Sequence, residues 1–316
     1  MAKAESAARR RRRSTGPVGE VMIYKRKWPA AVFLIPAFLF MVIFLYYPFF
    51  RNIVDSFFNI RILGGPTGKF IGLENYLKIV PGLETTDPNM MTALGNTLLL
   101  MLCTIVFQVG IALLLALMVD SIRRGAQVFR TLFFFPIVVS ATALGLMFNL
   151  LLMSRGPINQ IIERFGGEAI IFKEEYTFLT MAIPVIWQYV GFYFVILVTG
   201  LNNISEDIKE AAAIDGAIGL KRIWYITLPL LRNVLITCLT LSITGALKVF
   251  DMPWVMFPPN FSDAYLTGTY MYYQTFNVGN VDYAAAIAVV IVLLGVVLSR
   301  LSRLVFREKD YGKGEA

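Results

Sequence analysis

Six long apolar stretches, almost free of charged residues, alternate with polar segments along the chain. The hydrocarbon core of a bilayer is about 30 Å thick and is crossed by about 20 apolar residues in a helix. Backbone polar groups cannot face lipid unpaired, so such stretches are expected to be helical. The pattern therefore predicts an all-α membrane protein with six transmembrane helices, at residues 28–50, 93–119, 132–153, 176–204, 234–257 and 283–306.

A polar segment of helix-forming composition, residues 205–231, separates the fourth and fifth apolar stretches. Ser205 is placed to cap a helix whose first turn is acidic, where carboxylates meet the positive end of the helix dipole. Gly216 would end or bend this helix, and a second helical stretch at 220–227 would precede a break at Pro229. The segment is therefore expected to form a helix-turn-helix elbow at the membrane surface.

The composition agrees with a protein dissolved in lipid. Hydrophobic residues make up 57% of the chain, charged residues 16%, and the mean hydropathy is +0.65, which is too apolar for a soluble domain of this length. Histidine is absent, and the two cysteines, Cys103 and Cys238, lie inside apolar stretches. We therefore expect no His/Cys zinc site, no disulfide framework and no cofactor bound by this chain.

The basic residues predict the orientation of the chain, since cytoplasmic segments carry an excess of Lys and Arg. With the N-terminus inside, the segments 1–27, 120–131, 206–232 and 300–316 are cytoplasmic and hold 21 of the 29 Lys and Arg residues. Residues 1–27 and 308–316 are expected to be cytoplasmic tails around a transmembrane domain at 28–307. The five-arginine run from Arg9 to Arg13 is interpreted as a topology signal near anionic lipid rather than a nucleic-acid contact.

The elbow resembles the EAA loop of the permease subunits of ATP-binding-cassette (ABC) importers. The pattern is Glu-Ala-Ala, three residues, Gly, nine residues, and Ile-x-Leu-Pro, and every fixed position is filled at this spacing. The resemblance implies the type I importer permease fold, with the elbow docking on a cytoplasmic ATPase subunit. The residues to which it assigns this coupling are Glu210, Ala211, Ala212, Asp215, Gly216, Ile226, Leu228 and Pro229.

Two further motifs resemble elements of carbohydrate-uptake permeases, the class that includes maltose and glycerol-3-phosphate systems. Residues 70–76 match F-x-G-L-x-N-Y and are expected to form a turn at Gly72 and a short interfacial helix with Tyr76 at headgroup depth. Residues 156–159 match G-P-I-N, although a simple Gly-Pro turn explains them equally well.

The fourth and fifth stretches carry the candidate substrate residues: Gln188, Tyr189, Phe192, Ser242, Gly245 and Lys248. Tyr189 and Phe192 share a helix face, and their rings could cover the C–H surface of a sugar while the Gln188 amide binds hydroxyls. The alternative is an aromatic packing face. Small residues near Gly245 would either make room for a ligand or allow close helix packing.

Lys248 and Asp251 are ionisable residues inside the fifth stretch, where charge is costly and usually functional. They are three residues apart and could pair on one helix face. A structural ion pair and a role in substrate binding both remain open from the sequence.

The expected function is that of a permease subunit in an ATP-driven importer for a sugar, an oligosaccharide or related solute, in the cell membrane. The resemblance implies a second permease, two ATPase subunits and an extracytoplasmic solute-binding protein as partners. Glycerol-3-phosphate or another polyol is the alternative substrate. An ion-coupled secondary transporter is a second class, but Asp251 is its one clear embedded carboxylate; a membrane enzyme is disfavoured because histidine is absent.

Overall fold

The computed structural model describes residues 28–60, 66–122 and 125–305. Helices dominate these residues, and the chain forms two compact units, residues 1–51 and 52–316. The expected basic tail at 1–27, with its arginine run, and the tail at 308–316 lie outside the described residues.

The described part of the first unit is helical throughout. It consists of α2 (Trp28–Met41), a π-helical segment (Val42–Tyr46) and the start of α3 (Tyr47–Asp55). The stretch Val32–Asp55 is long and apolar enough to cross a membrane, and none of its most apolar window is buried. Its exposed apolar side chains therefore need lipid or another protein chain as their environment.

Four further helices are long enough to span a membrane, which confirms the predicted helices two, four, five and six. Helix two runs from Pro88 to Asp120, and helix four is α11 (Thr177–Asn202). Helix five, Arg232–Met256, comprises α15 (Arg232–Ala246) and α16 (Asp251–Met256), and helix six is α18 (Val281–Val305). Helix two comprises α5 (Pro88–Cys103), a π-helical segment (Thr104–Val109) and α6 (Gly110–Asp120).

The prediction of one continuous third helix at 132–153 is wrong. The chain instead forms α7 (Ala126–Val138) and α8 (Ala141–Leu151), with an angle of 91° between them. The backbone is extended at the junction, with ψ of 138° at Val139 and 132° at Ser140. An apolar pattern reports burial in lipid or protein but not the direction of the backbone, so this bend was invisible in the sequence.

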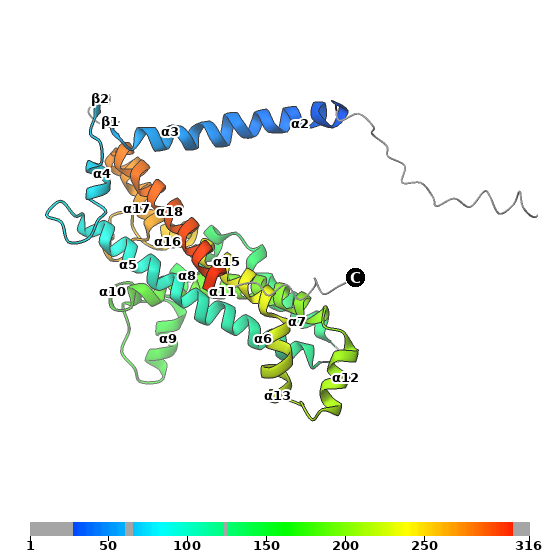
Figure 1. Ribbon diagram of the computed structural model, residues 1–316. Coiled ribbons are helices and arrows are strands. Elements are labelled where there is room, and N and C mark those ends of the chain that lie inside the picture. The colour runs from blue at the N-terminus through cyan, green and yellow to red at the C-terminus, as the bar shows by residue number, and fades with distance from the viewer. Residues whose placement is uncertain (1–27, 61–65, 123–124, 306–316) are drawn as a thin grey trace, which may run out of the picture. The chain divides into compact units, whose positions relative to one another are not determined.

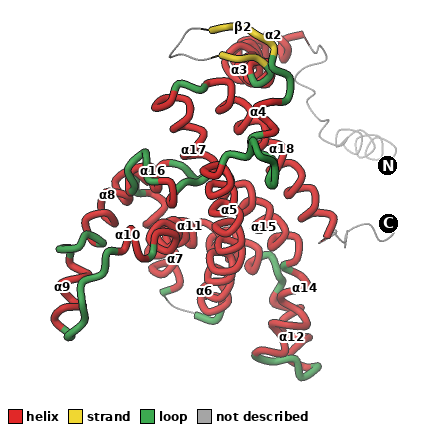
Figure 2. The backbone as a smooth tube through the Cα atoms, turned by 90° about the vertical axis from the view of Figure 1, so that its left-hand side faces the viewer, coloured by secondary structure: helices red, strands yellow, loops and turns green. Residues whose placement is uncertain are grey.

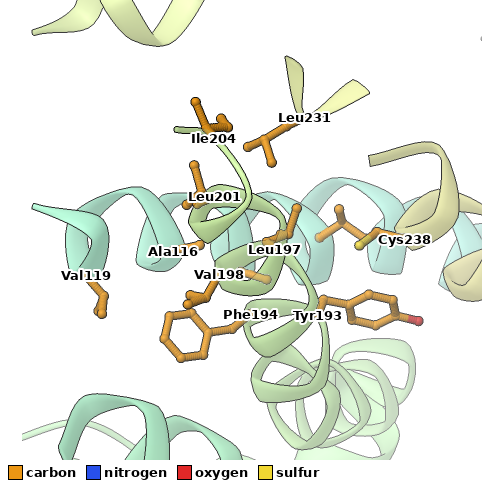
Figure 3. Close-up of a cluster of buried hydrophobic side chains, with 12 residues drawn as sticks. Ala116, Val119, Tyr193, Phe194, Leu197, Val198, Leu201, Ile204, Leu231 and Cys238 are labelled. Atoms are coloured by element: carbon orange, nitrogen blue, oxygen red, sulfur yellow. The ribbon is translucent and has the colours of Figure 1, made fainter. Parts of the chain in front are cut away.

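Apolar side chains from α6, α11 and the region that follows the elbow form one core (Figure 3). Figure 3 shows Phe194, Leu197 and Leu201 on successive turns of α11, and these residues are at most 1% exposed. They are packed with Ala116 of α6 and with Leu231, just before α15. On another part of α11, a Cβ at Gly191 would clash with the backbone oxygen of Phe133 in α7. This core fixes α11 against the neighbouring helices.

Short elements lie at the end of the second unit that is opposite the elbow, residues 205–231 (Figures 1 and 2). A hairpin of β1 (Phe58–Ile60) and β2 (Pro66–Phe70) precedes α4 (Glu74–Leu77). The turn expected at Gly72 is present, with φ of 61°. Further short helices are α9 (Pro157–Arg164), α10 (Phe172–Glu175) and α17 (Thr267–Tyr273).

The two carbohydrate-permease motifs provide buried hydrogen bonds. Asn75 is fully buried and donates to the Ser56 backbone oxygen and to Asp282 Oδ2, both at 3.2 Å. Asn159 is also fully buried and exchanges hydrogen bonds with the Ile170 backbone, at 2.8 and 2.9 Å. Because a buried polar group left unpaired is costly, these side chains fix the loops that carry them.

Asp87 joins the N-terminal end of α5 to α17 and α18. One carboxylate oxygen accepts the Asn89 backbone N–H at 3.0 Å and caps α5, and the other accepts the hydroxyls of Tyr270 and Tyr283. Burial, with the hydrogen bond to Asp87, raises the pKa of Tyr270, so its phenol stays protonated and donates. This contact connects three elements that are far apart in the sequence.

The elbow comprises α12 (Glu206–Ile214), α13 (Leu220–Arg222), a π-helical segment (Ile223–Thr227) and α14 (Leu228–Leu230). Figures 1 and 2 show α12 at the opposite end of the second unit from α4 and α17. The expected turn is present, since Gly216 has φ of 74°.

Two details of the elbow differ from the prediction. Ser205 precedes α12 but makes no side-chain capping hydrogen bond. Pro229 does not break the second helix, because the backbone remains helical at Thr227, Leu228 and Leu231. The π-helical turn before Pro229 widens the helix, which accommodates a residue that has no N–H and a bulky ring.

Candidate functional site

A cavity of about 330 Å³ lies between the π-helical segment of helix two, α8, α11, α15 and α16. All six residues predicted to bind substrate line it: Gln188, Tyr189, Phe192, Ser242, Gly245 and Lys248. The same cavity is also lined by Thr104, Gln108, Thr244 and Asp251. The structure therefore brings the six predicted residues together. They come from two helices whose relative positions the sequence does not show.

The α11 wall combines an amide with aromatic rings. Gln188 is 4% exposed, and its Nε2 donates to the Val139 backbone oxygen at 3.3 Å, a carbonyl at the junction of α7 and α8. Tyr189 is 39% exposed and Phe192 is half-buried. The bend in the third helix thus orients Gln188, while the two rings remain available at the cavity surface.

The α15 wall combines a buried hydroxyl with an open glycine. Ser242 is 1% exposed and donates to Thr104 Oγ1 at 3.1 Å, and Thr104 in turn donates to the Met101 backbone oxygen at 2.9 Å. Ser242 therefore joins α15 to helix two as well as lining the cavity. A Cβ at Gly245 would lie 3.8 Å from the Tyr193 hydroxyl, so glycine leaves this part of the cavity open.

The sequence analysis missed the contribution of helix two. Thr104 and Gln108 are 2% and 3% exposed and lie in a π-helical segment, a feature common at functional sites because it redirects side chains. The available signal was Gln108 itself, a polar residue in the middle of an otherwise apolar stretch.

Lys248 and Asp251 both line the cavity and are both exposed. Lys248 and Asp251 do not form an ion pair with each other, unlike Lys209, which pairs with Asp120 and Glu206. Of the two possibilities left open by the sequence, the ion pair on one helix face is not formed, because α15 ends at Ala246 and α16 begins at Asp251. The intervening turn places Lys248 outside regular helix.

The predicted coupling residues are distributed over the elbow, which the structure forms as a compact unit. Ala212 is 5% exposed, and its carbonyl accepts the Ala217 N–H at 2.8 Å, which closes the turn. Ile226 and Leu228 are half-buried. The exposed members are Glu210, Ala211, Asp215, Gly216 and Pro229.

The elbow also exposes large apolar side chains that the motif does not include. Ile214 is 88% exposed, and Leu220, Tyr225, Trp224 and Ile218 are 74%, 72%, 68% and 68% exposed. We call these five residues the apolar elbow surface. Such a surface on a polar segment is typical of a protein-binding site. The apolar elbow surface was not predicted from the sequence, because the exposure of its five side chains depends on how the elbow turns at Gly216.

Lys209 connects the elbow to helix two. Its Nζ lies 3.0 Å from Glu206 Oε1 and 3.5 Å from Asp120 Oδ1. The side chains of Lys209 and Asp120 are 17% and 18% exposed. Asp120 is the last residue of α6, where a negative charge opposes the helix dipole, so Lys209 offsets an unfavourable charge. Helix two also carries Thr104 and Gln108 into the cavity.

The family model for the binding-protein-dependent transport system inner membrane component matches residues 108–310. The lactose transport system permease protein LacF of Rhizobium radiobacter is 30% identical over 287 residues, which cover 88% of this chain and 94% of LacF. The arabinooligosaccharides transport system permease protein AraP of Bacillus subtilis is 29% identical over 289 residues, 89% of each chain.

A chain of a bacterial ABC transporter involved in the import of the acidic polysaccharide alginate has a similar fold. Its TM-score is 0.78 at 22% sequence identity, and the match covers 90% of this chain and 96% of that chain. The family match spans well over half of the chain and includes the elbow and both main cavity walls. The chain described here therefore belongs to the binding-protein-dependent transport system inner membrane component family, the permease subunits of ABC importers.

Proposed function

We propose that this chain is one of two permease subunits of an ATP-driven saccharide importer and that its cavity forms part of the translocation pathway. The observation that carries the proposal is the cavity itself, where an exposed tyrosine ring and a half-buried phenylalanine ring lie beside amide and hydroxyl groups. Apolar rings suit the C–H faces of a sugar, and the polar groups suit its hydroxyls.

The proposed substrate residues have distinct roles. Tyr189 and Phe192 pack against a sugar ring, and Gln188, held by Val139, presents its amide in a fixed orientation. Gly245 leaves room for the ligand, and Lys248 binds hydroxyls or a negative group. Ser242 acts mainly by positioning, because its hydroxyl already donates to Thr104.

A sugar is supported by the names of several relatives. Those relatives include permeases for arabinooligosaccharides and for lactose. Glycerol-3-phosphate was the alternative substrate considered from the sequence. It is not favoured, because the solutes named for these two relatives are sugars. Family membership likewise favours the importer over an ion-coupled secondary transporter.

The elbow is proposed to dock on an ATPase subunit through the apolar elbow surface and the exposed part of the EAA motif. Two ATPase subunits would bind and hydrolyse ATP, one under each permease, and this chain would bind no cofactor and catalyse no reaction. A second permease would close the open side of the cavity, and an extracytoplasmic solute-binding protein would deliver the substrate. Both termini and the elbow would then be cytoplasmic, as the Lys and Arg bias predicts.

The test is uptake of a panel of labelled oligosaccharides and glycerol-3-phosphate by cells with and without this chain, with intracellular ATP depleted in parallel. We expect uptake of one saccharide to be lost in cells that lack this chain and also in cells that have the chain but are depleted of ATP. Uptake that survives ATP depletion but collapses with the ion gradient would contradict the proposal.

A further inference from the structure

A groove between α15 and α18 adjoins the cavity and is rich in positive charge. It has a volume of about 410 Å³, and Thr244 and Lys248 line both the groove and the cavity. Arg300 and Arg303 line the groove as well, and its described lining includes no acidic residue. The only acidic residue that lines the cavity is Asp251.

The two exposed arginines lie at the level of the middle of α15. Ser302 of α18 shares a hydrogen bond of 3.3 Å with Thr240 of α15, which fixes the level of this part of α18. Thr240 is about two helical turns from Arg232, about 12 Å at 1.5 Å per residue. Arg300 and Arg303 therefore lie beside the middle of α15 rather than at its elbow end, where arginines that only reach the interface would be expected.

The exposed face of α15 is also polar. Asn233, Thr237 and Thr244 lie on this face at helical spacing, interrupted by Leu241, and are exposed or half-buried. Lys248 follows in the turn after α15 and is exposed. A helix face in contact with lipid would expose apolar side chains instead. This polar face, with Arg300 and Arg303 beside it, is suited to a path that contains water and solute.

Ser299 adds a further polar group to the groove. Its hydroxyl is buried and has no hydrogen-bond partner among the described residues, and the residue lines the groove together with the arginines. Buried hydroxyls are normally paired, so this donor is available to a bound group.

From this arrangement we infer that the translocated saccharide carries carboxylate groups, which pass from Lys248 in the cavity to Arg300 and Arg303 in the groove. The inference rests on the proposed function and specifies its substrate class. Guanidinium groups bind carboxylates through two parallel hydrogen bonds, which an ammonium group cannot do.

A lipid is the alternative occupant of the groove. Its chain would contact four aliphatic residues while the arginines bind its headgroup: Leu247, Ile291, Val292 and Val296.

The experiment uses the complete transporter, with its own binding protein, in liposomes of neutral phosphatidylcholine. Labelled digalacturonate and galactobiose, which differ in their carboxylates, are tested beside other such acidic and neutral pairs. The expected result is ATP-dependent uptake of an acidic member that exceeds uptake of its neutral partner by about 10-fold or more.

Variants then assign the effect to this groove. Arg300→Gln with Arg303→Gln is expected to slow acidic uptake by about 10-fold at saturating loaded binding protein, and Arg300→Lys with Arg303→Lys should retain more of it. Arg155→Gln, a matched loss of charge at an exposed site outside the groove, should leave uptake unchanged. Transporter abundance is measured for each variant.

Three results would overturn the inference. Preferential uptake of neutral saccharides would leave the proposed function standing but exclude carboxylate substrates. Equal acidic uptake by wild type and the double glutamine variant would remove the arginines from the pathway. An effect of that variant only in vesicles with anionic phospholipid would assign the groove to a lipid. If no saccharide is transported at all, the proposed function itself fails.

Discussion

Single residues in the cavity divide into those that are free to bind a ligand and those already committed to the fold. Ser242 is bound to Thr104, and Gln188 to Val139. Tyr189 and Phe192 keep exposed ring surface. Substitution of Tyr189 or Phe192 should therefore weaken substrate binding alone. Substitution of Ser242 or Gln188 would also weaken the contacts between helices.

We expect Tyr189→Ala and Phe192→Ala each to lower saccharide uptake by about 3- to 10-fold, because stacking of a ring contributes about 0.5–1.5 kcal/mol. Membrane abundance should stay at the wild-type level, since neither ring is fully buried. Initial uptake rates and immunoblots of membranes check this. Phe165→Ala is the matched control, because Phe165 is 86% exposed and lies outside the cavity. Unchanged uptake in both variants would remove these rings from the site.

At the scale of elements, the elbow is the part of the chain whose conformation depends most on single backbone positions. Gly216 has φ of 74°, and nothing lies within 4 Å of a Cβ placed there. A side chain at this position meets no steric obstacle, so its effect comes from the backbone alone. The left-handed conformation costs other residues about 1–2 kcal/mol.

Gly216→Leu is therefore expected to shift the elbow turn and to reduce uptake relative to ATP hydrolysis, with assembly of the transporter intact. ATPase activity and uptake are measured on the same reconstituted complex. Gly82→Leu is the matched control, since Gly82 has φ of 85° and equally open surroundings in the loop between α4 and α5. Wild-type coupling in Gly216→Leu would contradict a coupling role for this turn.

The Lys209–Asp120 ion pair joins the elbow to helix two, which also lines the cavity. Lys209→Met should weaken the contact by about 1 kcal/mol and lower uptake per ATP by about 5-fold. Exchange of the two charges, Lys209→Asp with Asp120→Lys, should restore part of the coupling, which a merely structural loss would not do. Lys221→Met, at an exposed elbow position, controls for the loss of positive charge. Because an aspartate at position 209 would face Glu206, the exchange is made together with Glu206→Gln. No rescue by the exchanged pair in this background would contradict a coupling role for the contact.

At the scale of the whole molecule, the second unit has two chemically different ends. The elbow lies at one end, and α4 and α17 lie at the other (Figures 1 and 2). The distribution of Lys and Arg predicts that the elbow end is cytoplasmic. The orientation can be tested by cysteine labelling, because the chain has two cysteines, Cys103 and Cys238, and two substitutions remove them.

In a background of Cys103→Ala and Cys238→Ala, Phe165→Cys should react with a membrane-impermeant maleimide applied from outside, and Ile214→Cys should react only after the membrane is opened. Phe165 and Ile214 are 86% and 88% exposed, so access to solvent is matched. Mass spectrometry of the purified chain gives the labelled fraction. The reverse pattern would show that the predicted orientation is wrong.

The sequence by itself determined the number and position of most spanning helices and the elbow. Lipid demands long apolar helices, so hydropathy is a direct record of them. Gly216 marked the turn because few other residues adopt its conformation. Helical spacing predicted that Tyr189 and Phe192 share one helix face, but whether that face lined a cavity or packed against a helix stayed open from the sequence.

Only the tertiary structure decided how these pieces meet. It bent the third helix by 91° at Val139 and Ser140, brought Thr104 into the cavity, and separated Lys248 from Asp251 by a turn. These features depend on contacts between residues distant in the chain and on backbone angles at single positions. A pattern of polarity along a chain reflects the environment of each residue, water or lipid. It does not specify which distant residues are in contact or which angles the backbone adopts at one position.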